Sequence, residues 1–183
     1  MRHFALALSL LLSLAACTDP PPVAPVVPVV PVAPVVPATG EVKKQHVPLE
    51  AYTAYDATKD GKAQIASAQA DAKGKNKRVL VMFGGNWCKW CKALDGTFAN
   101  DGAVKAVLDK SFVLVHVDSD TNGPLNDAWG NPFANGFPVL VVLDADGAKL
   151  HVQETGSLEK EDKSVSHDPD KVVTFLKRWA PAS

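Results

Sequence analysis

Short apolar runs between residues 79 and 153 predict four β-strands. The runs are rich in valine and bounded by turn-forming residues, which is typical of strands in a covered sheet. The predicted strands are residues 79–83, 112–117, 139–143 and 149–153. Between the last two strands, the stretch 144–147 (DADG) predicts a tight hairpin turn, so these two strands should run antiparallel.

Helical signals surround these strands. Residues 51–73 are rich in alanine and favour a helix that Gly74 stops. The last predicted helix places its apolar residues on one face and is closed by Pro181. The expected helices are residues 64–72, one opening at Cys88, one capped by Asp101, one at 124–129 and one capped by Asp168.

The alternation of strands and helices sets the fold class. Strands that alternate with helices and end in an antiparallel hairpin predict an α/β domain, with a mixed central sheet covered by helices on both faces. Residues 47–183 are long enough to form one such domain with its own core.

The first 46 residues carry no such pattern. Residues 1–3 are a short basic head, and residues 4–14 are an apolar run too short for a permanent membrane span. The run ends in Leu-Ala-Ala before Cys17, which resembles a bacterial lipoprotein signal. The resemblance implies that residues 1–16 are removed and that Cys17 bears a lipid. The alternative is an ordinary signal peptide in which Cys17 is incidental.

A proline- and valine-rich segment follows the lipidation signal. Proline recurs about every third residue in 20–38, which blocks helix and sheet and favours an extended polyproline II rod. Residues 17–46 are therefore expected to be a linker, either a semi-rigid stalk or a tether of no fixed length. Thr18 after the lipid-bearing cysteine favours the outer over the inner membrane of a bacterial envelope, with the domain facing the periplasm.

Charge and composition exclude some classes of partner. The formal net charge is −1, and no basic stripe with interleaved aromatic residues indicates nucleic-acid binding. We expect a monomer without a cofactor.

The strongest chemical signal is the stretch 78–98 (RVLVMFGGNWCKWCKALDGTF). A strand, a Gly-Gly-Asn turn and Trp87 lead into two cysteines at a helix start, where they lie on one face and can form a disulfide. Unpaired N–H groups and the helix dipole favour the thiolate of Cys88, with Lys89 and Lys92 nearby, so a lowered pKa would make it a nucleophile. Cys91 is placed to attack the resulting mixed disulfide.

A structural zinc site and an inert disulfide are the two alternative uses of these cysteines. A structural zinc site needs four ligands at close spacing, but the remaining cysteine is Cys17 and the five histidines are scattered. We therefore expect no metal. An inert structural disulfide remains the alternative to redox chemistry.

The segment W-C-x-x-C-K, with its strand, turn and helix, resembles the active site of the thioredoxin superfamily. The order of elements from Gln64 to Trp179 is similar to that family too. The resemblance implies a cis peptide bond at Pro138, and substrate contacts by Trp87, Phe137 and Pro138. The backbone of Phe137 would pair with an extended substrate segment.

The chain departs from the family pattern at several positions. Met82 stands where thioredoxin carries a buried acid that assists proton movement at the second cysteine. Lys89-Trp90 replaces the Gly-Pro dipeptide that helps set the reduction potential. Gly96 replaces a helix-kinking proline, and residues 121–135 form a longer loop, expected to shape a partner surface or to be a plain loop.

These observations predict an exported, membrane-tethered thiol–disulfide oxidoreductase. We expect a reductase that acts on cysteine-containing proteins and is supplied by an upstream thiol donor. An oxidase or isomerase is the alternative within the enzyme class, although isomerases of this fold usually dimerise through an added domain. A binding module with a permanent disulfide is the alternative outside it.

Overall fold

The structure is a computed structural model that describes residues 53–182. The predicted signal peptide (1–16), the lipidation of Cys17 and nearly all of the segment before the domain, including the linker 17–46, lie outside these residues. Within 53–182, no helix combines the length and the apolar character needed to cross a membrane.

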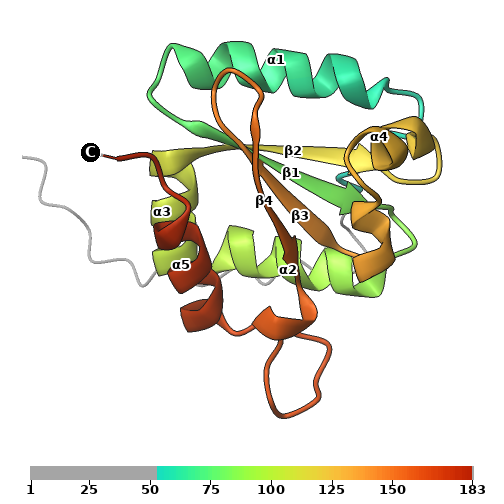
Figure 1. Cartoon of the computed structure of the whole chain (residues 1–183). Helices are drawn as coiled ribbons and strands as arrows, with labels where there is room; N and C mark the ends of the chain where they lie inside the picture. Colours follow the sequence, from blue (N-terminus) through green and yellow to red (C-terminus); the bar gives the residue numbers. More distant parts are fainter. Residues whose placement is uncertain (1–52, 183) are drawn as a thin grey trace, which may run out of the picture. The chain divides into compact units, whose positions relative to one another are not determined.

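A mixed sheet of four strands forms the centre of the domain, in the order β2-β1-β3-β4 (Figure 1). Strand β1 pairs in parallel with β2 and antiparallel with β3, which in turn pairs antiparallel with β4 through the predicted hairpin. The strands are β1 (Arg78–Gly84), β2 (Phe112–Asp118), β3 (Val139–Leu143) and β4 (Lys149–Glu154). All four predicted strands and the expected fold class are confirmed.

Helices cover both faces of the sheet, as the alternation of elements predicted (Figure 1). Strand β1 is buried from Val79 to its end, and its side chains alternate between two apolar clusters. Leu80 and Met82 pack in the cluster that holds α2, α3 and α5, whereas Val81 and Phe83 pack with α1 and α4. The α-helices are α1 (Gly61–Lys73), α2 (Lys89–Asn100), α3 (Gly102–Ser111), α4 (Gly123–Ala128) and α5 (Pro169–Arg178).

Aspartate caps define where several helices begin. Asp101 and Asp168 cap α3 and α5 as predicted. Asp60 caps α1, and its Oδ1 accepts from the backbone N–H groups of Lys62 and Ala63 at 2.7 and 3.1 Å. The helical preference assigned to residues before Asp60 is therefore wrong for 53–59, because the cap sets the start of α1 and Tyr55 lies ahead of it in a segment without regular secondary structure.

The loop 121–135 is not a plain loop. It contains α4 and a short 3-10 helix, Pro132–Asn135. Trp129 and Phe133 turn inward and meet Phe83 edge to face, with ring centroids 5.7 and 5.0 Å apart. These two aromatic residues thus close the apolar cluster beneath β1.

Candidate active site

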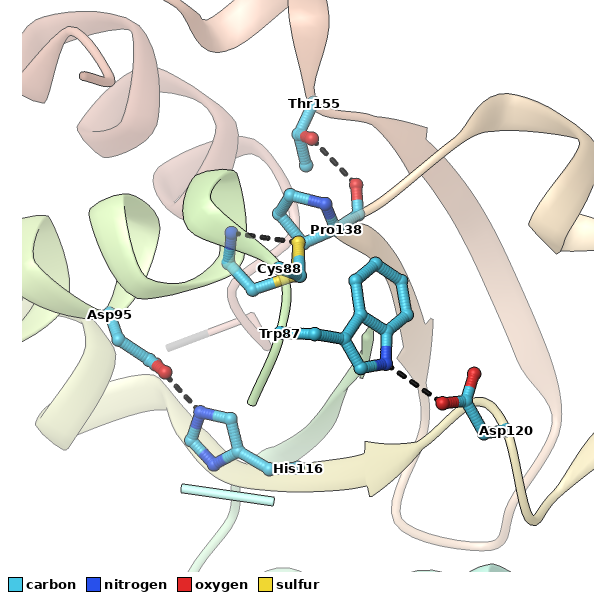
Figure 2. The surroundings of a disulfide bond; sticks show 8 residues. Trp87, Cys88, Asp95, His116, Asp120, Pro138 and Thr155 are labelled. Atoms are coloured by element: carbon cyan, nitrogen blue, oxygen red, sulfur yellow. Dashed lines mark hydrogen bonds and ion pairs between the residues drawn. A yellow bond between two sulfur atoms is a disulfide. The ribbon is translucent and has the colours of Figure 1, made fainter. Parts of the chain in front are cut away.

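The site forms where β1 ends and α2 begins. Cys88 is the N-cap residue of α2, and it is joined by a disulfide to Cys91 in the first turn, with a Cα–Cα distance of 5.2 Å. The backbone N–H of Cys91 donates to Cys88 Sγ at 3.1 Å, so the sulfur accepts one of the unpaired donors of the helix start (Figure 2). This is the position at which a helix dipole favours a thiolate.

The two cysteines of the disulfide differ little in exposure. Cys88 is 5% exposed and Cys91 is fully buried. In the disulfide-bonded state Cys88 is nearly as buried as Cys91, because its sulfur is bonded to Cys91 and its side chain belongs to the apolar cluster. Cys88 is still slightly more accessible to an incoming thiolate than Cys91.

Gly84 makes room for the buried sulfur. A Cβ on this residue would overlap both Cys91 Sγ and the hydroxyl of Tyr55, each within 3.0 Å of the position that the Cβ would occupy. Only a residue without a side chain permits this close approach of β1 to the disulfide. The Gly-Gly-Asn turn is therefore a packing requirement as well as a turn signal.

Pro138 lies beside the disulfide, as Figure 2 shows. The Phe137–Pro138 peptide bond is cis, which agrees with the expectation from the resemblance. The carbonyl oxygen of Pro138 accepts a hydrogen bond from the hydroxyl of Thr155 at 2.6 Å, a buried contact that ties the start of β3 to the end of β4.

An aromatic rim borders the site. Trp87 is 57% exposed, and its indole N–H donates to Asp120 Oδ2 at 2.8 Å (Figure 2). Trp87 meets Phe137 edge to face at 5.6 Å, and Phe137 meets Phe133 at 5.2 Å. Trp87 and Phe137, both expected to contact substrate, thus pack against each other.

Behind the disulfide lies a polar pair that the sequence analysis missed. Asp95 is one helical turn beyond Cys91, and its Oδ1 lies 2.6 Å from Nε2 of His116 on β2 (Figure 2). His116 is the register partner of Met82. A carboxylate is therefore present on this side of the sheet, contributed by α2 and not by β1. The available signal was an acid four residues after Cys91 on the buried face of the helix.

Tyr55 was missed as well. It is buried, meets His116 edge to face at 5.2 Å, and exchanges two hydrogen bonds with Asn86 of the active-site turn. Its hydroxyl has no hydrogen-bond partner. Burial raises the pKa of Tyr55 well above its ordinary value, and the carboxylates of Asp95 and Asp118 raise it further.

A second buried imidazole packs against the residue between the cysteines. Trp90 meets His167 edge to face at 5.7 Å. His167 is fully buried, and neither ring nitrogen has a hydrogen-bond partner. Desolvation lowers the pKa of His167 to about 4, so its ring is neutral at pH 7. No local sequence signal pointed to this contact.

Metal binding has no support in the part of the chain that the structure describes. No group of three or more His, Cys, Asp or Glu side chains converges there in a manner that could hold an ion. The two cysteines are bonded to each other.

Comparisons with known proteins agree with this geometry. Residues 60–145 match a family model described as thioredoxin-like. No match to a curated protein was found. The crystal structure of a disulphide isomerase from Xylella fastidiosa is similar at 30% sequence identity and a TM-score of 0.60, covering 70% of this chain and 97% of that one.

Two further solved structures are similar at lower identity. A mutant thioredoxin from Halobacterium salinarum is 18% identical with a TM-score of 0.44, over 70% of this chain and 91% of its own. The C-terminal domain of DsbD from Neisseria meningitidis is 21% identical with a TM-score of 0.47, over 66% and 96%. With the family model, the Xylella protein and the disulfide at the start of α2 taken together, the chain belongs to the thioredoxin-like family and carries that family's disulfide-oxidoreductase fold with a CxxC pair.

Proposed function

We propose that this protein is a thiol–disulfide oxidoreductase that reduces disulfides of other proteins, with Cys88 as the attacking residue and Cys91 as the resolving residue. The observation that carries the proposal is the disulfide itself, set at the N-terminus of α2 with Cys88, the slightly more exposed cysteine, beside Pro138. A disulfide that served only to stabilise the fold would not need this position at a helix start, where thiolate character is favoured.

The reaction is two successive exchanges. The Cys88 thiolate attacks one sulfur of a substrate disulfide, and the other substrate sulfur leaves as a thiolate. The Cys91 thiolate then attacks Cys88 Sγ, which restores the disulfide of this protein and releases the second substrate sulfur. An upstream dithiol donor returns the protein to its reduced state.

Trp87, Phe137 and Pro138 are the proposed substrate contacts. Trp87 offers an exposed aromatic face, and the half-buried Phe137 packs against it. An extended peptide would pair with the backbone at Phe137 while its cysteine approaches Cys88. Apolar residues flanking the substrate cysteine would cover the rim.

Trapping a substrate tests the assignment of roles. With Cys91→Ser, the mixed disulfide formed through Cys88 cannot be resolved and should accumulate, so it can be isolated with the substrate attached. Cys88→Ser is the matched variant and should trap nothing. Accumulation with Cys88→Ser instead would reverse the two roles, and accumulation with neither variant would leave the binding-module alternative in place.

Residues 1–46 place this activity outside the cytosol in our proposal. Removal of residues 1–16, lipidation of Cys17 and the proline-rich linker 17–46 would hold the domain 47–183 at a membrane of the bacterial envelope, facing the periplasm and as a monomer. Mass spectrometry of the mature N-terminus should find an acylated Cys17. An unmodified N-terminus at another residue would remove the anchor.

Isomerisation is a second candidate, favoured by one comparison. The similar Xylella protein is described as a disulphide isomerase, and its chain is almost entirely covered by the match. Reactivation of a scrambled disulfide protein, measured beside the reduction potential of Cys88–Cys91 against glutathione, separates the two: a strongly reducing potential with little reactivation favours the reductase.

A further inference from the structure

We propose that the phenol of Tyr55 is the hydrogen-bond donor that stabilises the thiolate of Cys91 once the disulfide opens. Tyr55 is thereby assigned a catalytic role that the CxxC motif does not contain. The inference rests on the redox function proposed above, although its decisive measurement requires no substrate.

The first support is position. Tyr55 Oη and Cys91 Sγ both lie within 3.0 Å of the point that a Cβ on Gly84 would occupy, so the two atoms are neighbours across that glycine. Tyr55 is held there by Asn86, which accepts from its backbone N–H at 3.2 Å and donates to its carbonyl oxygen at 2.7 Å. The hydroxyl is thus fixed beside the buried sulfur by the turn that precedes Cys88.

The second support is an unpartnered donor. The Tyr55 hydroxyl is buried and forms no hydrogen bond while Cys88 and Cys91 are bonded to each other. A buried polar group without a partner is unfavourable, so a state of the protein that supplies a partner is stabilised. Opening the disulfide creates such a partner, because a thiolate is a much stronger acceptor than a disulfide sulfur.

The third support is charge. The groups that face Tyr55 are Asp95 from α2 and His116 and Asp118 from β2. The two carboxylates and the burial keep the phenol protonated, so Tyr55 donates but does not act as a base. A hydrogen bond from this phenol can lower the pKa of the buried Cys91 thiol, whereas Met82, in the same cluster, can neither donate nor accept a proton.

Neither of the two thiol–disulfide exchange steps requires a proton from Tyr55. When the upstream donor reduces this protein, a donor thiolate attacks Cys88 Sγ and the Cys88–Cys91 bond breaks. Cys91 leaves as a thiolate that accepts the Tyr55 hydrogen bond. In resolution, the Cys91 thiol first loses its proton to solvent; its thiolate then attacks Cys88 Sγ and expels the substrate thiolate. The Tyr55 hydrogen bond favours the charged form of Cys91 in both directions.

The test is the pKa of each thiol in the reduced protein, followed residue by residue through the Cβ chemical shifts in NMR. Tyr55→Phe keeps the ring and removes the hydroxyl, and it should raise the pKa of Cys91 by about 1–2 units while leaving Cys88 nearly unchanged. Thr97→Val is the matched control, because it removes a hydroxyl from α2 that donates to Ala93, and the Cys91 pKa should stay as in the unmodified protein.

A second measurement needs no variant. In the unmodified reduced protein, the Cζ chemical shift of Tyr55 should change at the pKa of Cys91. An unchanged Cys91 pKa in Tyr55→Phe, an equal shift of both cysteines, or a Tyr55 signal that ignores the titration of Cys91 would each overturn the inference. If the pKa shift is found but Cys91→Ser traps no substrate, the role of Tyr55 stands and the proposed reductase function fails.

Discussion

Trp90, which lies between the two cysteines, packs edge to face against His167, whose imidazole has no hydrogen-bond partner at either nitrogen. His167 directly precedes Asp168, the N-cap of α5. The helix that bears the disulfide therefore packs against the residue just before the N-cap of α5, whose ring is buried and neutral.

This burial predicts a loss of stability in acid. The folded-state pKa of His167 is about 4, below the ordinary value of 6.5, so the unfolded chain binds the extra proton first. The stabilisation from this residue is complete above pH 6.5 and is lost as the pH falls from there to about 4, by about 3 kcal/mol in the free energy of unfolding.

His167→Leu should reduce that pH dependence. Denaturant unfolding of both proteins at neutral pH and near the lowered pKa measures the difference between the two slopes. The unmodified protein should lose more of its unfolding free energy on acidification than the variant. Equal losses would mean that His167 is not the buried neutral group described here.

Gly84→Ala tests the close approach of β1 to the disulfide. The added Cβ would overlap Cys91 Sγ and Tyr55 Oη, so the free energy of unfolding should fall by about 1–3 kcal/mol. Gly96→Ala is the matched control on α2, where the nearest atom to the new Cβ is Asn100 Nδ2 at 4.0 Å. That change should stabilise the helix by about 1 kcal/mol. Equal effects at the two positions would argue against the packing requirement at Gly84.

Trp87→Ala tests the aromatic rim. Because the side chain is more than half exposed, the free energy of unfolding should change by less than about 1 kcal/mol. The KM for a protein disulfide should rise severalfold, whereas the rate with a small disulfide should hardly change. Trp87→Phe keeps an aromatic face without the hydrogen bond to Asp120 and should retain most of the binding. Equal losses with both kinds of substrate would assign Trp87 to the chemistry at Cys88.

Met82→Asp tests how the lack of an acid at this position affects the rate of the resolving step. Met82 is fully buried in the cluster that contains Cys91, so the resolving step of the unmodified protein should speed up with pH as Cys91 ionises. A carboxyl at this position could take the Cys91 proton and flatten that dependence. Its own pKa would be raised by burial, and the unfolding free energy should fall by about 1–3 kcal/mol.

Met82→Leu is the matched control, with a similar volume and no acid, and should cost less than about 1.5 kcal/mol. Stopped-flow measurement of resolution from about pH 6 to 8 covers the range below the pKa of a free thiol. A fast, flat profile in the unmodified protein would show that Met82 imposes no limit.

The sequence by itself determined the elements and the redox pair, because both depend on neighbours along the chain. The apolar runs of the strands, the aspartate caps of α3 and α5, and the hairpin turn are short-range signals, and these were located correctly. Cys88 and Cys91 are three residues apart at a helix start, so their pairing required no knowledge of the rest of the fold. The expected helix 64–72 lies within α1, whereas the helical preference of 53–59 was wrong, because the Asp60 cap sets the helix start against a weak alanine propensity.

Only the tertiary structure decided what surrounds the sulfurs. Asp95 meets His116, and Trp90 meets His167, across long sequence separations that no local pattern encodes. The register of β2 against β1 places His116 next to Met82, and a slip by one residue would turn its side chain to the opposite face of the sheet. The rotation of α2 and the path of the chain before α1 then bring Asp95 and Tyr55 to the same spot. The proximity of Asp95, His116 and Tyr55 depends on how whole elements pack. For that reason the sequence alone could not predict it.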